Sequence, residues 1–122
     1  MIPAKYNIGD SDKRPWGSWV VLDMAPGLVL KKLVVDPGRR ISLQRHAYRS
    51  ERWVVMQGVA TVQRAEEQLV LRQGEEVAIP QHCLHRLSNE STEPIVVLEI
   101  QVGGVLSEDD IVRFDDDFGR HE

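Results

Sequence analysis

Four polar side chains at strand-like spacing could together hold a metal ion. Gln44 and His46 stand two residues apart between two glycines, and Glu51 opens the apolar run that follows. Residues two apart in a strand point to the same face, so two paired strands could bring an amide oxygen, an imidazole and a carboxylate to one point. These groups are ligands for divalent metals. His85, from a distant strand, is the expected fourth ligand.

This set of residue types favours a catalytic metal over a structural one. The amide and the imidazoles bind as neutral ligands and Glu51 supplies one negative charge, so a divalent ion keeps a net charge of about +1 and remains a Lewis acid. Structural zinc sites more often use thiolates, and Cys83 is the single cysteine. The competing interpretation is that His46 and His85 are core side chains and Glu51 is an exposed carboxylate at a strand end.

Length and composition fit one domain and exclude several partners. A chain of 122 residues with a net charge of -4 is typical of a single globular domain. Its weak acidity gives no reason to expect a nucleic-acid or membrane partner. No apolar run approaches the roughly 20 residues that span a bilayer, and the polar N-terminus has no secretory h-region. One cysteine allows no internal disulfide, so a cytoplasmic location is expected.

The elements that would position the ligands are short strands separated by turns. Apolar runs predict strands over residues 16–23, 28–35, 41–46, 53–57, 60–64, 68–71, 76–79, 85–87 and 95–102. This rhythm is typical of a sandwich or barrel. Residues 1–15 are expected to form a polar arm, and residues 16–122 a single domain. The tail at 108–114 is predicted to make a short helical turn with Ser107 as its N-cap, and the three tryptophans are expected in the core or a dimer contact.

A second stretch that begins with a glycine covers residues 74–89. Together with the first stretch, it resembles the paired motifs of the cupin superfamily. The residues that carry the resemblance are Gly38, Gln44, His46, Glu51 and Gly58 in the first motif and Gly74, Pro80, His85 and Asn89 in the second. The resemblance implies an all-β fold, the cupin double-stranded β-helix, which is a jelly-roll barrel.

The chain also resembles a narrower group, the type II mannose-6-phosphate isomerase domain. The matching segments are RPWGSW at 14–19, SLQRH at 42–46, ERWVV at 51–55 and EDDIVRFDDDFGR at 108–120. In many relatives this domain forms the C-terminal end of a mannose-1-phosphate guanylyltransferase. The resemblance implies a bound divalent metal, zinc first, with manganese, cobalt or nickel as alternatives. It also implies interconversion of mannose 6-phosphate and fructose 6-phosphate. No glycine-rich nucleotide-phosphate loop is present, so nucleotidyl transfer is not expected.

Positive side chains are needed for a sugar phosphate, and arginine binds phosphate in a bidentate fork. Arg49 matches an arginine of the isomerase family and is the first candidate for phosphate binding or for stabilising the enediolate. Arg113 and Arg120 lie in the family-like tail. Arg45 and Arg86 alternate out of phase with the ligands and are expected to face outward.

The proton-transfer base is not identified by the sequence. The candidates are metal-bound hydroxide, His82, Lys31 and Lys32. His82 sits in the loop before a predicted ligand, where a solvated side chain is the simpler interpretation. The two lysines lie within the predicted strand 28–35.

Two other functions stay open because the rim differs from that of the isomerase family. The differing positions are Ala47, Tyr48, Arg52, His82 and Leu84. The chain could be a non-catalytic module that binds a sugar phosphate or regulates a separate sugar-nucleotide enzyme. It could also be a metal-dependent enzyme of another kind, such as a dioxygenase or a different sugar epimerase. Because long edge strands need cover and cupins commonly pair through their sheets, a homodimer is expected.

Overall fold

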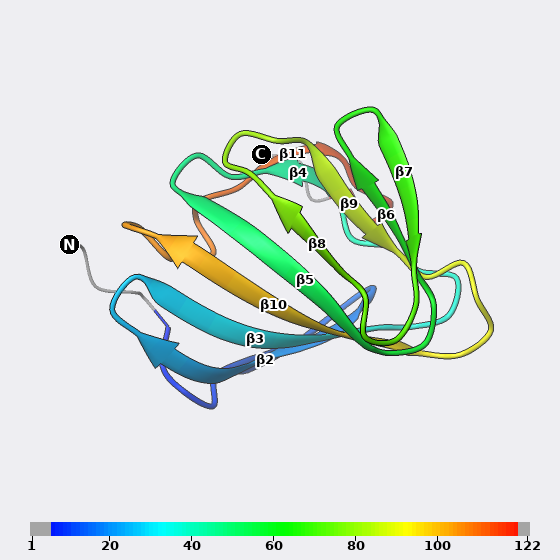
Figure 1. Ribbon diagram of the computed structural model, residues 1–122, viewed down its shortest axis with the longest axis horizontal. Coiled ribbons are helices and arrows are strands. Elements are labelled where there is room, and N and C mark those ends of the chain that lie inside the picture. Colours follow the sequence, from blue (N-terminus) through cyan, green and yellow to red (C-terminus); the bar gives the residue numbers. More distant parts are fainter. Residues whose placement is uncertain (1–5, 120–122) are drawn as a thin grey trace.

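The fold is built from two antiparallel β-sheets that face each other (Figure 1). The computed structural model describes residues 6–119. The first sheet has six strands in the order β1 (Ser11–Arg14), β2 (Gly17–Ala25), β3 (Leu28–Val35), β10 (Ile95–Gly103), β5 (Arg49–Gln57) and β8 (Glu76–Ile79). The second has five, in the order β11 (Val112–Asp115), β4 (Leu43–Arg45), β9 (His85–Ser88), β6 (Ala60–Arg64) and β7 (Glu67–Leu71). The predicted jelly-roll architecture is confirmed.

Strands alone make up the secondary structure of the described range. None of residues 6–119 lies in a helix, so this range holds no helix able to cross a membrane. Strands 28–35, 60–64 and 76–79 have the predicted bounds, and the others shift by a few residues at their ends. The largest extension is β5, which begins at Arg49 rather than Trp53.

The core lies between the sheets because inward and outward positions alternate along each strand. In β3 every second residue is buried, which is the pattern expected of a strand with one face on a core. Trp16, Trp19 and Trp53 are all buried, as predicted. The inward row of two neighbouring strands changes from apolar to polar toward the same end, and there it buries four polar side chains: Arg49, Glu51, Glu99 and Gln101.

The N-terminal segment is part of the fold from Tyr6 onward. Residues 11–14, expected in an arm, form the edge strand β1 and pair with β2. Tyr6 is only 6% exposed and packs edge-on against Trp19, with 6.0 Å between the ring centroids. An aromatic side chain in the core ties down a segment that its polar composition predicts to be free.

The predicted helical turn at 108–114 is wrong. A turn follows Ser107, whose hydroxyl accepts a hydrogen bond from the Asp109 amide, and the chain then enters the strand β11, which pairs with β4. The ladder with β4 satisfies backbone groups that a short helix would leave open, so pairing decides the conformation.

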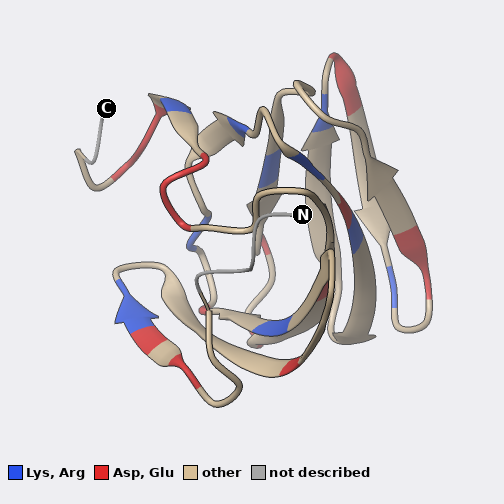
Figure 2. Cartoon of the chain, turned by 90° about the vertical axis from the view of Figure 1, so that its left-hand side faces the viewer, with Lys and Arg blue, Asp and Glu red and all other residues tan. Residues whose placement is uncertain are grey.

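The C-terminal segment also buries Arg86, which was expected to face outward. Arg86 does point away from the barrel interior, yet it is only 6% exposed. Its Nη1 and Nη2 donate to the Asp115 carboxylate and carbonyl at 3.0 and 2.9 Å, and its Nε donates to the Ile41 carbonyl. Acidic residues run along this segment (red in Figure 2), so it meets the arginine with opposite charge.

A tight contact at Gly103 sets the start of β5, and alanine there is expected to destabilise the fold by about 1–3 kcal/mol. Gly103 lies opposite Arg49 in the β5–β10 ladder. A Cβ at this position would lie 2.2 Å from the Tyr48 carbonyl oxygen and 2.9 Å from the Arg49 Cα. Urea denaturation of the metal-free protein measures the loss. The neighbouring Gly104→Ala is the matched control, because a Cβ there meets nothing within 4 Å. Equal stability of the two variants would contradict this account.

Candidate metal centre

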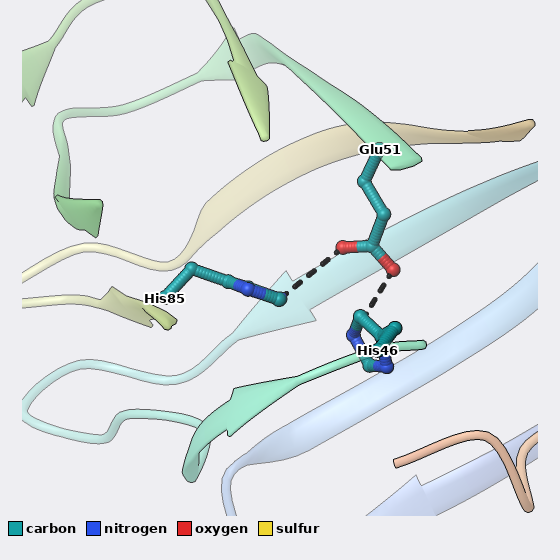
Figure 3. A group of neighbouring side chains, drawn as sticks. All are labelled: His46, Glu51 and His85. Atoms are coloured by element: carbon teal, nitrogen blue, oxygen red, sulfur yellow. Dashed lines mark ion pairs between the residues drawn. The ribbon is translucent and has the colours of Figure 1, made fainter. Parts of the chain in front are cut away.

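Three of the four predicted ligands meet in the polar end of the interior (Figure 3). His46 directly follows β4, Glu51 projects from β5 and His85 begins β9, and all three side chains are buried. Their ligand atoms lie within 4.8 Å of one another. Oε2 of Glu51 is 3.3 Å from Nε2 of His46, and Oε1 is 3.5 Å from Nε2 of His85.

Backbone carbonyls fix the tautomer of both histidines. Nδ1 of His46 lies 2.6 Å from the Asp110 carbonyl oxygen, and Nδ1 of His85 lies 2.8 Å from the Cys83 carbonyl oxygen. A carbonyl can only accept, so Nδ1 carries the proton in each ring and Nε2 presents a lone pair. Metal-binding histidines are usually oriented in this way by a second hydrogen bond.

The three residues fit a divalent cation because their acceptor atoms face one another, and two of these atoms have no hydrogen-bond donor. Oε1 of Glu51 and Nε2 of His85 are buried and have no hydrogen-bond partner. Leaving buried acceptors unpaired is costly. Two ligand atoms bound to one ion at about 2.1 Å, at a tetrahedral angle, would lie about 3.4 Å apart, which agrees with the two distances from the carboxylate. These three residues could therefore hold a divalent metal.

Electrostatics keep two of these groups, His46 and Glu51, in the forms that bind metal. Burial lowers the pKa of His46 to about 4, against the opposing effect of the Glu51 charge. Burial works against the charge of Glu51, but the Arg49 guanidinium outweighs it and holds the pKa of its carboxyl well below the ordinary value. At neutral pH the imidazole of His46 is neutral and the carboxyl of Glu51 is ionised.

Arg49 is a built-in partner of the centre. Its Nε and Nη2 both lie 2.8 Å from Oε2 of Glu51, and Nη2 is 3.3 Å from Nε2 of His46. Nη1 donates to the Ser107 carbonyl at 3.1 Å. Burial disfavours its charge, but the carboxylates of Glu51 and Glu99 more than compensate and raise its pKa. The guanidinium thus touches two predicted ligands and also lines the adjacent pocket.

Gln44, the remaining predicted ligand, lies next to this cluster. It stands opposite His85 in the β4–β9 ladder, so the two side chains share a face. Its amide nitrogen donates to the hydroxyl and carbonyl of Ser42 at 3.1 and 3.3 Å. That leaves the amide oxygen available as an acceptor, and its role as a ligand stays a prediction.

A pocket beside the centre is lined by charged and aromatic side chains. It includes the side chains expected to act on a substrate, Arg49 and Lys31, together with Gln44. Its other lining residues are Arg14, Trp16, Trp19, Leu33, Ile41, Ser42, Glu99, Glu108, Ile111 and Arg113. Four of the thirteen are basic and two are acidic, so the lining carries a net positive charge that suits an anionic ligand.

The candidates for the proton-transfer base differ in whether their side chains reach the pocket. Nζ of Lys31 is buried 3.2 Å from Oε2 of Glu108 and 4.2 Å from the Trp19 ring centroid. His82 is exposed and touches the centre through its backbone, since its amide donates to the His46 carbonyl. Lys32 alternates to the outer face of β3. Arg113 lines the pocket, and Arg120 lies outside the described residues.

Three acidic residues that sequence reasoning missed complete the site. Asp110 holds the His46 ring through its carbonyl, and its carboxylate accepts from the amides of Ala47 and Tyr48 at 2.9 and 3.0 Å. Glu108 accepts from Lys31, and Glu99 is buried in the pocket wall. A polar residue in phase with buried apolar ones, as in the run 95–102, was the available signal for Glu99. Nothing local pointed to Asp110 or Glu108.

Removing the Asp110 carboxylate is expected to lower metal affinity about 10- to 100-fold, as is typical of groups that orient ligands. In Asp110→Ala the amides after His46 lose their acceptor, and the ring is held less firmly. Competition against a chelator of known zinc affinity measures the change. Asp117→Ala is the control, because it removes a carboxylate of the same segment that pairs with Arg40, away from the centre. If both variants bind zinc like the unmodified protein, Asp110 does not position the ligand.

Comparison with known proteins agrees with this arrangement. The family described as "Mannose-6-phosphate isomerase C-terminal" matches residues 5–116. The xanthan biosynthesis protein XanB of Xanthomonas campestris pv. campestris is 44% identical over 107 residues, which cover 88% of this chain and 23% of XanB. The chain therefore spans about a quarter of the length of this relative.

Solved structures agree on the fold. A putative sugar phosphate isomerase from Acidithiobacillus ferrooxidans is 27% identical with a TM-score of 0.58, and the match covers 62% of this chain and 50% of that one. A Klebsiella pneumoniae protein with a double-stranded β-helix domain is 16% identical with a TM-score of 0.69, over 93% of this chain and 91% of its own. The second likeness concerns the fold alone.

Proposed function

Because the chain belongs to the mannose-6-phosphate isomerase C-terminal family, we propose that it is a metal-dependent isomerase that interconverts mannose 6-phosphate and fructose 6-phosphate. The observation that carries the proposal is the buried cluster of His46, Glu51 and His85, with two unpaired acceptor atoms, beside a pocket with basic walls. The cluster suits a divalent metal and the pocket suits a phosphorylated sugar. Zinc is the first candidate, because neutral nitrogen ligands with one carboxylate suit it.

One group of residues would bind the metal, and another would bind and orient the sugar. Gln44, His46, Glu51 and His85 would hold the ion, and a bound divalent ion supplies Lewis acidity toward the oxygens at C1 and C2 of the open-chain sugar. Arg49 reaches from Glu51 into the pocket, where its remaining N–H groups can orient a sugar oxygen and offset negative charge that develops there. Trp16 and Trp19 supply rigid apolar wall against which the carbon chain can lie.

The test is a direct assay of the purified protein loaded in turn with zinc, manganese or cobalt. Mannose 6-phosphate should be converted to fructose 6-phosphate, and chelation should stop the conversion. A folded, metal-loaded protein without turnover would overturn the proposal. Calorimetry on the same samples then identifies a non-catalytic module, which would bind mannose 6-phosphate with unchanged ligand at the end.

We also infer that two copies of the chain pair through the outer face of the six-stranded sheet. The outward positions of β10 are apolar throughout, with Val96, Leu98 and Ile100 partly covered and Val102 46% exposed. Contiguous apolar surface of this kind is commonly an interface. Light scattering should give about twice the 13.9 kDa of one chain, and a mass of one chain at micromolar concentration would contradict the inference.

A further inference from the structure

A second buried carboxylate, Glu99, lines the pocket and is not among the clustered metal ligands. It projects inward from β10 and is 5% exposed. In the β5–β10 ladder Glu99 stands opposite Trp53, and Glu51 stands opposite Gln101. Glu99 is therefore the diagonal neighbour of Glu51 on the same face, about 7–8 Å away by strand geometry. The Glu99–Trp53 pair is therefore the next inward-facing pair along the ladder from Glu51 and lies farther inside the barrel.

The hydrogen bonds of Glu99 do not commit it to one protonation state. Oε1 accepts from Trp53 Nε1 at 3.1 Å, and Oε2 accepts from Gln101 Nε2 at 2.9 Å. Both donors are neutral. The nearest cation, Nζ of Lys31, is 3.9 Å from Oε2 but only 3.2 Å from Glu108. Neutral donors favour the ionised carboxyl less strongly than a charged donor would.

Gln101 can serve both states of this carboxyl. Its Oε1 is buried and has no hydrogen-bond partner. Its amide nitrogen donates to Oε2 of Glu99, which suits the ionised form. A glutamine side chain carries both a donor and an acceptor. If the Gln101 amide turns by 180°, its unpaired oxygen can accept the proton of a protonated Glu99. An ambivalent neighbour of this kind allows proton uptake and release without leaving the acid unpaired.

The charges that face Glu99 come from three elements. Glu51 and Arg49 lie on β5, Lys31 lies on β3, and Glu108 lies in the segment after β10. Burial and the negative charge of Glu51 raise the pKa of Glu99 above its ordinary value, against the opposing effect of Lys31 and Arg49. The free-energy gap between its two protonation states is therefore narrower at neutral pH than for an exposed glutamate.

The other acidic groups of the centre and its pocket are fixed as anions. Arg49 holds Glu51 ionised. Burial works against the charge of Glu108, but Lys31 and the Tyr6 hydroxyl lower its pKa. Of the carboxyls lining the described pocket, Glu99 is the one whose surroundings favour proton exchange.

On these grounds, and resting on the proposed function, we propose that Glu99 is the catalytic base that moves the substrate proton between C2 and C1. Glu99 takes the proton from C2 of the open-chain aldose, the C2–H electrons form the C1–C2 double bond, and O1 is protonated to give the enediol. Glu99 then returns its proton to C1 as O2 loses its proton and the C2 carbonyl forms. One hydrogen passes from C2 to C1 and one proton from O2 to O1, and no oxidant is needed.

The experiment uses the zinc-loaded protein, mannose 6-phosphate deuterated at C2, and the variants Glu99→Gln and Glu99→Asp. Glutamine keeps the acceptor for Trp53 but cannot take a proton, so kcat should fall about 100- to 10,000-fold, the range for loss of a general base. Movement of deuterium away from C2, either to C1 or to water, is followed by NMR and should stop with it. Bound zinc and the affinity for fructose 6-phosphate should stay within threefold of the unmodified protein. Glu90→Gln, on the exposed surface, is the matched control.

Each outcome decides between the two proposals. An unmodified protein without turnover overturns the proposed function and the base assignment with it. An active protein whose Glu99→Gln variant keeps more than a tenth of kcat, or still moves deuterium away from C2, overturns the base assignment alone. If Glu99→Gln does not fold, Glu99→Asp decides. If Glu99→Asp lowers kcat but activity still falls at low pH as it does in the unmodified protein, the assignment is supported. An unchanged kcat overturns it.

Discussion

Replacing Glu51 by glutamine is expected to lower zinc affinity more than 100-fold and to destabilise the metal-free fold by about 3–5 kcal/mol. The first effect follows because the carboxylate is the single anionic group of the ligand cluster. The second follows because Arg49 is buried, and two of its nitrogens lie 2.8 Å from Oε2 of Glu51. Removing one partner of a buried ion pair leaves the other charge uncompensated.

Chelator competition measures the first effect of Glu51→Gln and urea denaturation the second. Glu76→Gln is the control, because Glu76 is an exposed carboxylate whose nearest cation, Arg52, is also exposed. It should change stability by less than about 0.5 kcal/mol. A Glu51→Gln variant as stable as the control would mean that the Arg49–Glu51 pair does not stabilise the fold. Unchanged zinc affinity would remove Glu51 from the ligand set.

Acidifying the metal-free protein from pH 6.5 to 4 is expected to reduce the free energy of unfolding by about 3 kcal/mol. The pKa of His46 is about 4 in the fold, against 6.5 as its ordinary value. Between these two values the unfolded chain binds a proton that the folded chain does not, so stability falls as the pH falls. Glu51, whose pKa is also lowered, adds to the loss below its ordinary value of 4.5.

Urea denaturation at pH 7.5, 6.5, 5.5 and 4.5 measures this loss. His46→Gln should flatten the dependence above pH 4.5, whereas His82→Gln should leave it unchanged, because that side chain is exposed. Stability that stays constant from pH 6.5 to 4.5 in the unmodified protein would contradict a buried, neutral His46. Saturating zinc should raise the stability at each pH, because an ion that binds only the folded form stabilises it.

The nearness of the candidate ligands could be predicted because their positions follow local rules. Period-two alternation puts Gln44 in phase with His46 and Glu51 in phase with Trp53, and the resemblance to cupins supplied the distant His85. The same alternation could have revealed Glu99, which lies in phase with buried Ile95 and Val97. Polar residues at inward positions of an apolar strand are informative, and Glu99 lies at such a position outside the motifs that carry the family resemblance.

The groups that hold the ligands could not be predicted, because their partners are remote in sequence. His46 is oriented by Asp110, 64 residues away. Ser107 and the acidic residues after it favour a helical start locally, yet pairing of 112–115 with β4 made a strand. Tyr6, in a segment that looks like a free arm, is buried against Trp19. In each case a tertiary contact outweighed local preference.

The contacts around the centre join residues far apart in sequence, and this affects the rates of folding and unfolding. Tyr6 meets Glu108 across 102 residues, and Lys31 meets Glu108 across 77. Contacts that close such long loops form late on the folding path, so the cation has nothing preorganised to bind before the rate-limiting barrier is crossed. Zinc should therefore lengthen the lifetime of the native protein by slowing its unfolding, and leave the refolding rate nearly as it is without metal.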